Sequence, residues 1–219
     1  MTELLYITTL VLGNLLGSVP TGFLVGRVRG VDLRTVGSGN IGATNTVRVL
    51  GKTAGAVVLT IDAAKGVLAC WGIPRLFASV APGFSPDRSL LAVVAGCGAI
   101  LGHNYTCWLG FKGGKGVATS AGVLAVLAPV AFLLEVVVWG GVFLVSRYVS
   151  LASITAAVAL PFLVWATEKN TLLTAFSTGI AVIVAYAHRS NIKRLMTRTE
   201  HRFMPASRKP GTHNSSENQ

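Results

Sequence analysis

The sequence predicts an all-α, polytopic integral membrane protein with about seven transmembrane helices. Two features of its composition carry this prediction: 52% of the 219 residues are hydrophobic, and only 12% are charged. A soluble domain usually has about 25% charged residues, so this chain has too few polar groups to cover a globule of its size in water. The composition therefore argues strongly against a soluble enzyme.

The third observation is a series of apolar segments separated by basic or glycine-rich connections. They lie near residues 4–26, 53–80, 89–109, 117–146, 151–166 and 171–187. The first has the length of a membrane-spanning helix and no basic region before it, so it does not read as a cleavable signal peptide. The fourth is too long for one crossing and contains Pro129, which favours two shorter helices.

The basic residues predict the side of the membrane on which each connection lies. They gather at 27–52, at 110–116 and from 188 onward, whereas the N-terminus and the connection at 81–88 have few. Basic connections favour the cytoplasmic side, so the N-terminus is predicted outside and the C-terminus in the cytoplasm. Because the connection at 110–116 and the tail from 188 are both predicted in the cytoplasm, the chain between them must cross the membrane an even number of times. The break at Pro129 gives four crossings in place of three. The net charge of +11 is then explained by topology rather than by nucleic-acid binding.

The chain reads as one domain with a tail. Residues 1–195 form the predicted transmembrane domain, in which we find no internal repeat, and residues 196–219 form a polar cytoplasmic tail that we expect to be disordered. The three cysteines, Cys70, Cys97 and Cys107, lie in apolar stretches without CxxC spacing. This pattern indicates packing residues rather than a disulfide framework or a zinc site.

Three polar, glycine-rich stretches on the predicted cytoplasmic side are candidates for a binding site. They are 36–45 followed by Arg48, 102–119, and 188–194. Glycine lets backbone N–H groups converge on a phosphate, and a lysine in the same loop adds a positive charge. Lys112-Gly-Gly-Lys115-Gly fits this description at the start of a predicted helix. The alternative is a flexible loop whose two lysines only reflect its cytoplasmic side.

Generic catalytic motifs do not fit this chain. Residues 37–42 match GxGxxG by letters, but no strand precedes them, which argues against a dinucleotide site. Residues 51–53 and 114–115 resemble the end of a Walker motif but lack its earlier glycine, so ATP hydrolysis is not supported. No histidine begins an HxxxxD pair and no serine lies in GxSxG, so the His–Asp acyltransferase dyad and the serine hydrolase elbow are both missing.

Charged residues and histidines near or within the apolar segments are further candidates. Asp62 and Lys65 are three residues apart, so they share a helix face and can neutralise each other, either as a structural ion pair or in direct chemistry. Glu135 stands alone among apolar residues, either on a proton or ion path or buried and neutral. His103 and His188 lie near predicted inside ends of helices. Such histidines are usually structural, but the basic residues after His188 suit an anion.

Four stretches carry a resemblance to a known family. They are GSVPTGFLVGR at 17–27, VGSGNIGATN at 36–45 with Arg48, GHNYTCWLGFKGGKGVAT at 102–119 and RYVSLAS at 147–153. Together they resemble the PlsY family, the bacterial membrane acyl-phosphate:glycerol-3-phosphate acyltransferases. The resemblance extends in the family's order to about residue 195, and its second and third motifs are highly specific in combination.

The resemblance implies a reaction and its surroundings. An acyl phosphate donates its fatty acyl group to the 1-hydroxyl of sn-glycerol 3-phosphate, giving lysophosphatidic acid and phosphate in the first acylation step of phospholipid biosynthesis. No cofactor is implied, neither acyl-CoA nor a metal. The expected partners are glycerol 3-phosphate, acyl phosphate and membrane lipids, with no nucleic acid, and we expect a monomer. The expected location is the bacterial plasma (inner) membrane, with the active site on the cytoplasmic face.

The residues in the three stretches, together with the resemblance, give a candidate site. The expected catalytic residues are Ser38, Arg48, Lys112, Lys115 and His188. The expected substrate-binding residues are Gly37, Gly39, Asn40, Gly42, Asn45, His103, Gly113, Gly114, Gly116, Ser150, Ser153 and Asn191. The loop at 112–116 is expected to cradle a phosphate and polarise the acyl carbonyl. His188 and Asn191 resemble the family's C-terminal pair, which implies that they position glycerol 3-phosphate.

The general base and two other classes of function stay open at this point. The resemblance suggests substrate-assisted transfer, in which the donor phosphate takes the hydroxyl proton while the protein supplies proximity and charge. A transporter or channel for a small anion would use Asp62, Lys65 and Glu135 as gating or coupling charges, but the chain has no evident inverted repeat. A structural scaffold would leave the three basic, glycine-rich stretches unexplained.

Overall fold

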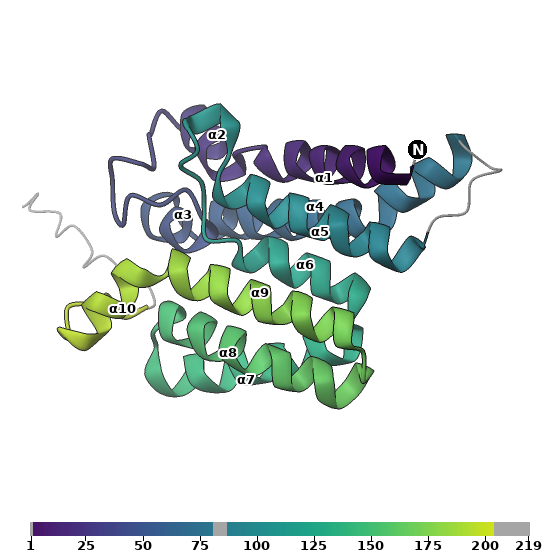
Figure 1. Cartoon of the computed structure of the whole chain (residues 1–219). Coiled ribbons are helices and arrows are strands. Elements are labelled where there is room, and N and C mark those ends of the chain that lie inside the picture. The colour runs from purple at the N-terminus through teal and green to yellow at the C-terminus, as the bar shows by residue number, and fades with distance from the viewer. Residues whose placement is uncertain (1, 81–86, 204–219) are drawn as a thin grey trace, which may run out of the picture.

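The computed structural model describes residues 2–80 and 87–203, and these residues form helices joined by connections, of which that between residues 28 and 43 is long (Figure 1). The helices are α1 Thr2–Ser18, α2 Thr21–Val28, α3 Ala43–Leu50, α4 Lys52–Val80, α5 Arg88–Asn104, η1 Cys107–Leu109, α6 Val117–Leu127, α7 Pro129–Ser146, α8 Val149–Glu168, α9 Thr171–Ala187 and α10 Arg189–Met196. The predicted all-helical membrane fold is confirmed.

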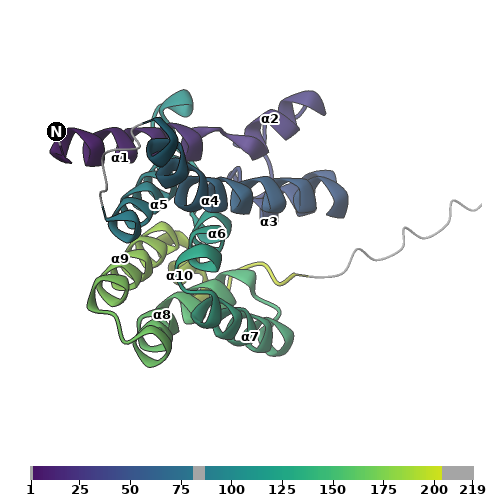
Figure 2. The same ribbon diagram turned by 90° about the vertical axis from the view of Figure 1, so that its right-hand side faces the viewer.

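The long helices pack side by side in a bundle. In Figure 1, α1, α4 and α5 form its upper part, α6 and α9 its middle, and α7 and α8 its lower part, and Figure 2 shows the same grouping from the end. The core around α6 holds Ile100, Val123, Leu124, Leu160 and Ile180, all at most 3% exposed. On α7, by contrast, apolar side chains are exposed along much of the surface, as expected for a helix that faces lipid.

The packing of α1 against α5 depends on small residues. Gly13 and Gly17 of α1 face the backbone of α5 at Ala95 and Ala99, so closely that a Cβ at either glycine would clash. Gly98 and Gly102 of α5 make the same approach to the backbone of α1. Both helices thus carry a GxxxG spacing, which is the usual way in which membrane helices bring their backbones together.

The break at Pro129 is where the sequence predicts it. Ala128 separates α6 from α7, and Pro129 is the first residue of α7, a position where a proline needs no hydrogen-bond partner for its nitrogen. Among residues 2–80 and 87–203, five helical segments have the length and composition of a membrane span. The helices α9 and α10, bent by 60° at their junction, have them only when taken together, and α6 is shorter, with 11 residues. The count of seven spans and the orientation of the termini stay predictions.

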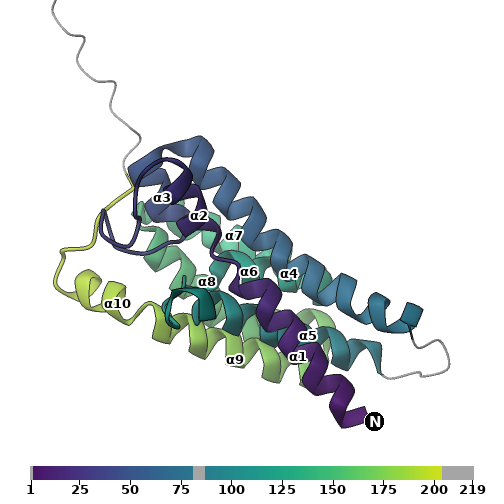
Figure 3. The same ribbon diagram turned by 90° about the horizontal axis from the view of Figure 1, so that it is seen from above.

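The three polar stretches lie together at one end of the bundle. α2, α3 and α10 share this end, and the start of α1 and the end of α4 lie at the other (Figures 1 and 3). At that other end Asp87 caps α5 by accepting hydrogen bonds from the amides of Ser89 and Leu90. The common location of the stretches agrees with the charge pattern, which put all three on one side of the membrane.

Two polar features of the sequence receive a structural account. Asp62 and Lys65 form a buried ion pair, with 2.7 Å between Oδ1 and Nζ. The side chain of Glu135, half-buried on α7, has no hydrogen bond or ion pair within residues 2–80 and 87–203. The expected disordered tail at 196–219 differs in its first part, because residues 197–203 make specific contacts with the bundle; its remainder, 204–219, lies outside the described residues.

Candidate functional site

A cavity of about 370 Å³ opens at the end of the bundle where the polar stretches meet. Its lining comes from all three of them, at residues 38–40, 104–105, 111–115, 186–187, 189–190 and 194. Lys112, Lys115, Arg189 and Arg194 supply four cationic side chains, and none of the described lining residues is acidic. Such a cavity is suited to an anion with more than one negative charge.

Asn45 builds the first wall of the cavity. Its Nδ2 donates to the carbonyls of Leu33 and Val36, both at 3.1 Å, and its Oδ1 accepts from the amide of Ser38 at 2.8 Å. The side chain is buried and uses both ends of its amide within the loop. Asn45, expected to bind substrate, therefore holds the loop that presents Ser38.

Glycine is required in this first loop for conformational reasons. Gly37 and Gly39 have φ of +62° and +70°, and a Cβ at Gly37 would collide with the amide of Asn45. Asn40 accepts a hydrogen bond from the amide of Gly42 at 2.8 Å, which closes the turn before α3. Gly39 and Asn40 line the cavity, whereas Gly37 and Gly42 shape the loop from outside it.

The lysine loop at 112–116 rests on the last turn of α5. The amides of Gly113 and Gly114 donate to the carbonyls of Asn104 and His103, both at 3.0 Å. A Cβ at Gly114 would meet the ring of His103, and one at Gly116 would meet the side-chain amide of Asn104. The loop therefore differs from the expected phosphate cradle. The amides of Gly113 and Gly114 are used to fix the loop, and the positive charge comes from the lysine side chains.

Lys115 is the most strongly influenced cation of the cavity. Its Nζ donates to Oδ1 of Asn191 at 2.5 Å. Burial lowers its pKa to about 8, Glu200 opposes this shift, and the positive charges of Arg194 and Arg48 add to it. Lys112, by contrast, is exposed at the mouth of the cavity. The two lysines therefore differ in burial and in hydrogen bonding, although the sequence pattern does not distinguish them.

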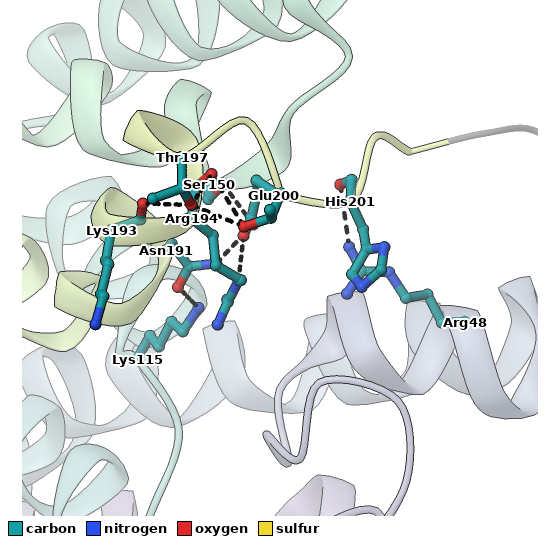
Figure 4. A network of polar contacts seen from close by, with 10 residues as sticks. Arg48, Lys115, Ser150, Asn191, Lys193, Arg194, Thr197, Glu200 and His201 are labelled. Atoms are coloured by element: carbon teal, nitrogen blue, oxygen red, sulfur yellow. Dashed lines mark hydrogen bonds and ion pairs between the residues drawn. The ribbon is translucent and has the colours of Figure 1, made fainter.

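A carboxylate organises the far side of Lys115 (Figure 4). Glu200 accepts hydrogen bonds from Asn191 Nδ2 at 2.7 Å, from Ser150 Oγ at 2.8 Å and from Arg194 Nε at 2.6 Å. Burial of Glu200 opposes ionisation, but these three donors outweigh it and lower the pKa of the carboxyl below its usual 4.5. Neither Asn191 nor Ser150 lines the cavity: Asn191 contacts Lys115 directly, and Ser150 is linked to the site through Glu200.

His188 lies at the bend between α9 and α10, with 3% of its surface exposed. Its Nδ1 donates to the carbonyl of Val184 at 2.8 Å, which leaves Nε2 as the unprotonated nitrogen of the neutral ring. Burial and the nearby charge of Lys115 lower its pKa to about 4, against the opposing effects of the Val184 bond and Glu200. His188 is therefore neutral at pH 7.

Three other expected residues lie outside the lining of the cavity. Arg48 points its guanidinium at the carbonyl of His201, at 3.5 Å (Figure 4). Ser153 accepts a hydrogen bond from the indole of Trp139 and belongs to the contact between α7 and α8. His103 is buried in the last turn of α5, beneath the lysine loop.

Sequence reasoning missed part of the site. Asn104, Tyr105, Phe111, Tyr186, Ala187, Arg189, Ser190 and Arg194 line the cavity but were not named as site residues. Most of them stand within the stretches 102–119 and 188–194, so their proximity to Lys112 and His188 was the available signal. Within the part of the chain that the structure describes, no three His, Cys, Asp or Glu side chains gather as they would around a metal ion.

Comparison with known proteins assigns the family. A family model described as glycerol-3-phosphate acyltransferase matches residues 7–198. The chain belongs to the glycerol-3-phosphate acyltransferase family. A family member from Geobacter sulfurreducens is 48% identical over 189 residues, covering 86% of this chain and 93% of the relative. One from Aquifex aeolicus is 46% identical over 191 residues, covering 86% and 94%.

Solved structures of this acyltransferase family have the same fold. The chain is similar to a crystal structure of PlsY, an integral membrane glycerol 3-phosphate acyltransferase, in its glycerol 3-phosphate form, with a TM-score of 0.81 and 40% identity over 91% of this chain and 96% of that one. A second structure, the lysophosphatidic acid form, gives a TM-score of 0.78. The predicted family is therefore confirmed: the chain is an acyltransferase and a multi-pass membrane protein.

Proposed function

We propose that this chain transfers a fatty acyl group from an acyl phosphate to the 1-hydroxyl of sn-glycerol 3-phosphate, the first acylation of phospholipid biosynthesis. The four cations around the cavity are the observation that carries the proposal. Both substrates bear phosphate groups, and two of the cations are arginines. One guanidinium can donate two parallel hydrogen bonds to two oxygens of a phosphate. The solved relatives are described as glycerol 3-phosphate and lysophosphatidic acid forms, which supports this acceptor and product.

The transfer replaces the mixed anhydride bond of the acyl phosphate by the ester bond of lysophosphatidic acid. The 1-oxygen of glycerol 3-phosphate attacks the acyl carbonyl carbon, and the bond from that carbon to the phosphate oxygen of the donor breaks. The products are lysophosphatidic acid and inorganic phosphate. We place the lysine loop and Arg194 at the phosphate groups, where fixed positive charge stabilises the departing phosphate. Ser38 donates a hydrogen bond from the opposite wall, and Arg48, outside the lining, adds positive charge near Lys115.

The hydroxyl proton goes to the departing phosphate in this proposal. His188 is a poor general base because its pKa is near 4, far below the value near the working pH at which base catalysis is efficient. An acyl phosphate is an activated donor with a good leaving group, so it does not need a strong base on the protein. Proximity and charge stabilisation are then what the chain supplies.

His188→Ala checks this assignment. We expect it to raise the KM for glycerol 3-phosphate roughly tenfold, because a buried, hydrogen-bonded ring beside Lys115 is lost. The shape of the kcat/KM profile between pH 5 and 9 should stay as in the wild type. Steady-state kinetics at several pH values measure both quantities. Loss of an acidic limb of the profile in the variant would identify His188 as the general base instead.

The donor is tested by phosphate release. Purified protein in detergent receives palmitoyl phosphate and glycerol 3-phosphate, without metal or coenzyme A. We expect turnover that requires glycerol 3-phosphate and yields lysophosphatidic acid. Turnover with palmitoyl-CoA in place of palmitoyl phosphate, and none with the phosphate, would show that the donor is wrong. Inactivity with both donors, from protein that melts cooperatively, would overturn the proposed reaction.

We also propose that the enzyme lies in the bacterial plasma membrane as a monomer, with its cavity on the cytoplasmic face. The gathering of basic residues at the cavity end supports this orientation. Acyl chains of donor and product then lie at the level of the membrane lipids, while glycerol 3-phosphate arrives from the cytoplasm. Labelling of a cysteine introduced near the cavity in intact and permeabilised cells decides the orientation.

A further inference from the structure

α4 carries two charges into the interior of the bundle. Asp62 and Lys65 are 3% and 4% exposed, and both members of the ion pair make a further hydrogen bond. Asp62 Oδ1 also accepts from Thr21 Oγ1 at 2.9 Å, and Lys65 Nζ also donates to the carbonyl of Val19 at 2.5 Å. Val19 lies between α1 and α2. The pair therefore joins α4 to the break between these two helices.

The same cluster reaches the lysine loop in two steps. His103 Nδ1 lies 3.7 Å from Asp62 Oδ1, and this ring is 7% exposed in the last turn of α5. The other side of the ring, at Nε2, faces Gly114 so closely that a Cβ there would collide with it. The amide of Gly114 donates to the carbonyl of His103 as well. The backbone between Lys112 and Lys115 therefore rests on both the ring and the carbonyl of His103.

Stability alone is a weak reason for such a pair. Removing two charges from water is costly, and replacement of a buried ion pair by apolar residues of similar volume is often neutral or stabilising. Charged side chains within transmembrane segments are costly and mark functional regions by default. Because Asp62 and Lys65 sit directly behind the support of the lysine loop, a fixed geometry of that loop is what the pair can provide.

We infer that Asp62 and Lys65 are positioning residues for the acyl transfer. Asp62, fixed by Lys65, packs against His103 from 3.7 Å and keeps the ring in place, and His103 supports the backbone of the loop that aims Lys112 and Lys115 at a phosphate. This inference rests on the proposed function, because it takes the lysine loop as the site of the glycerol 3-phosphate phosphate group. The competing explanation is that the pair only fastens α4 to α1 and α2, without acting on the loop.

A double-mutant cycle between Asp62→Asn and His103→Gln separates the two explanations. Each single variant should raise the KM for glycerol 3-phosphate roughly tenfold, while kcat falls less, because a displaced loop still carries both lysine charges close to the departing phosphate. If Asp62 acts through His103, the double variant should have the KM of the more affected single variant. Multiplication of the two effects, to roughly a hundredfold, overturns the inference, as does a wild-type KM in Asp62→Asn.

The matched control is Asp87→Asn, the same change at the opposite end of the bundle, where Asp87 caps α5. Its KM should equal that of the wild type, because asparagine caps a helix as well as aspartate does. If Asp62→Asn leaves Lys65 uncompensated and does not fold, Asp62→Asn combined with Lys65→Met replaces it in the cycle. A wild-type KM in that charge-free variant also overturns the inference.

Binding of glycerol 3-phosphate, measured in the absence of the acyl donor, distinguishes a failure of the positioning role from a failure of the proposed function. Stabilisation of the purified protein against heat by glycerol 3-phosphate gives an apparent Kd for each variant. The Kd should follow the same non-additive pattern as the KM. Additive effects on the Kd refute the positioning role even if the wild type turns over acyl phosphate. Absence of any stabilisation of the wild type refutes the proposed acceptor itself.

Discussion

Lys115→Met should lower kcat/KM by about 10²- to 10³-fold, the usual loss when one preorganised donor to a developing negative charge is removed. Lys115 is the cation with the most restricted setting in the cavity: it is partly buried, and Asn191 holds its Nζ at 2.5 Å. Methionine keeps a similar length and apolar stem, so the loss reports the charge. Steady-state kinetics with palmitoyl phosphate and glycerol 3-phosphate measure it.

The pH dependence of the wild type identifies the same residue. The pKa of Lys115 is about 8 in the folded protein, so its charge is present below pH 8 and is lost as the pH rises through that value. The kcat/KM of the free enzyme should therefore fall above pH 8. In Lys115→Arg the guanidinium stays protonated, and this basic limb should disappear, whatever the absolute rate of the variant.

Lys193→Met is the matched control. Lys193 stands on α10, exposed and outside the lining of the cavity, and Figure 4 shows its side chain directed away from Glu200. Its replacement removes the same charge from the same end of the molecule and should change kcat/KM less than twofold. An equal loss in both variants would mean that the general positive field, rather than Lys115 itself, drives the reaction.

The local features of the fold could be predicted because they depend on nearby residues. Pro129 cannot continue a helix, so the division between α6 and α7 follows from one residue and the length of its segment. Asp62 and Lys65 are one helical turn apart, and their pairing in the structure confirms the prediction of a shared face. The family is confirmed too, because its motifs are specific in combination.

The division of labour within the motifs could not be predicted. Asn45 and Ser38 are polar residues of one loop, and only the structure shows that the first builds the loop that presents the second. The amides of Gly113 and Gly114 looked free for a phosphate, but their partners are carbonyls of α5. Which amide meets which carbonyl depends on how α5 approaches the loop, and the sequence pattern contains no measure of that approach.

Glu200 shows the limit most clearly. It lies in a polar segment that composition assigns to a disordered tail, yet its side chain is 6% exposed and accepts three hydrogen bonds. One donor, Ser150, is 50 residues away in the sequence. An isolated glutamate among basic residues has many possible partners, and the packing of α10 against α8 is what selects Ser150, Asn191 and Arg194.

Glu200→Gln should lower kcat/KM roughly 10- to 100-fold, which corresponds to the loss of about 1.5–3 kcal/mol for a hydrogen bond to a charged group. The carboxylate orients the amide of Asn191: Nδ2 donates to Glu200, so Oδ1 is left for Lys115. Glutamine offers one oxygen where three donors now converge, and its own NH₂ group faces those donors. The Asn191 amide then loses its fixed orientation, and with it the position of Lys115.

The measurement for Glu200→Gln combines kinetics with thermal unfolding, because Glu200 also joins α10 to α8 through Ser150. Glu168→Gln, at the far end of α8, is the matched control and should retain wild-type kcat/KM. The pKa of Glu200 is lowered, so its contribution to stability is complete above pH 4.5 and is lost as the pH falls through the lowered value. A variant that melts like the wild type yet keeps its full kcat/KM would refute the link from Glu200 to Lys115.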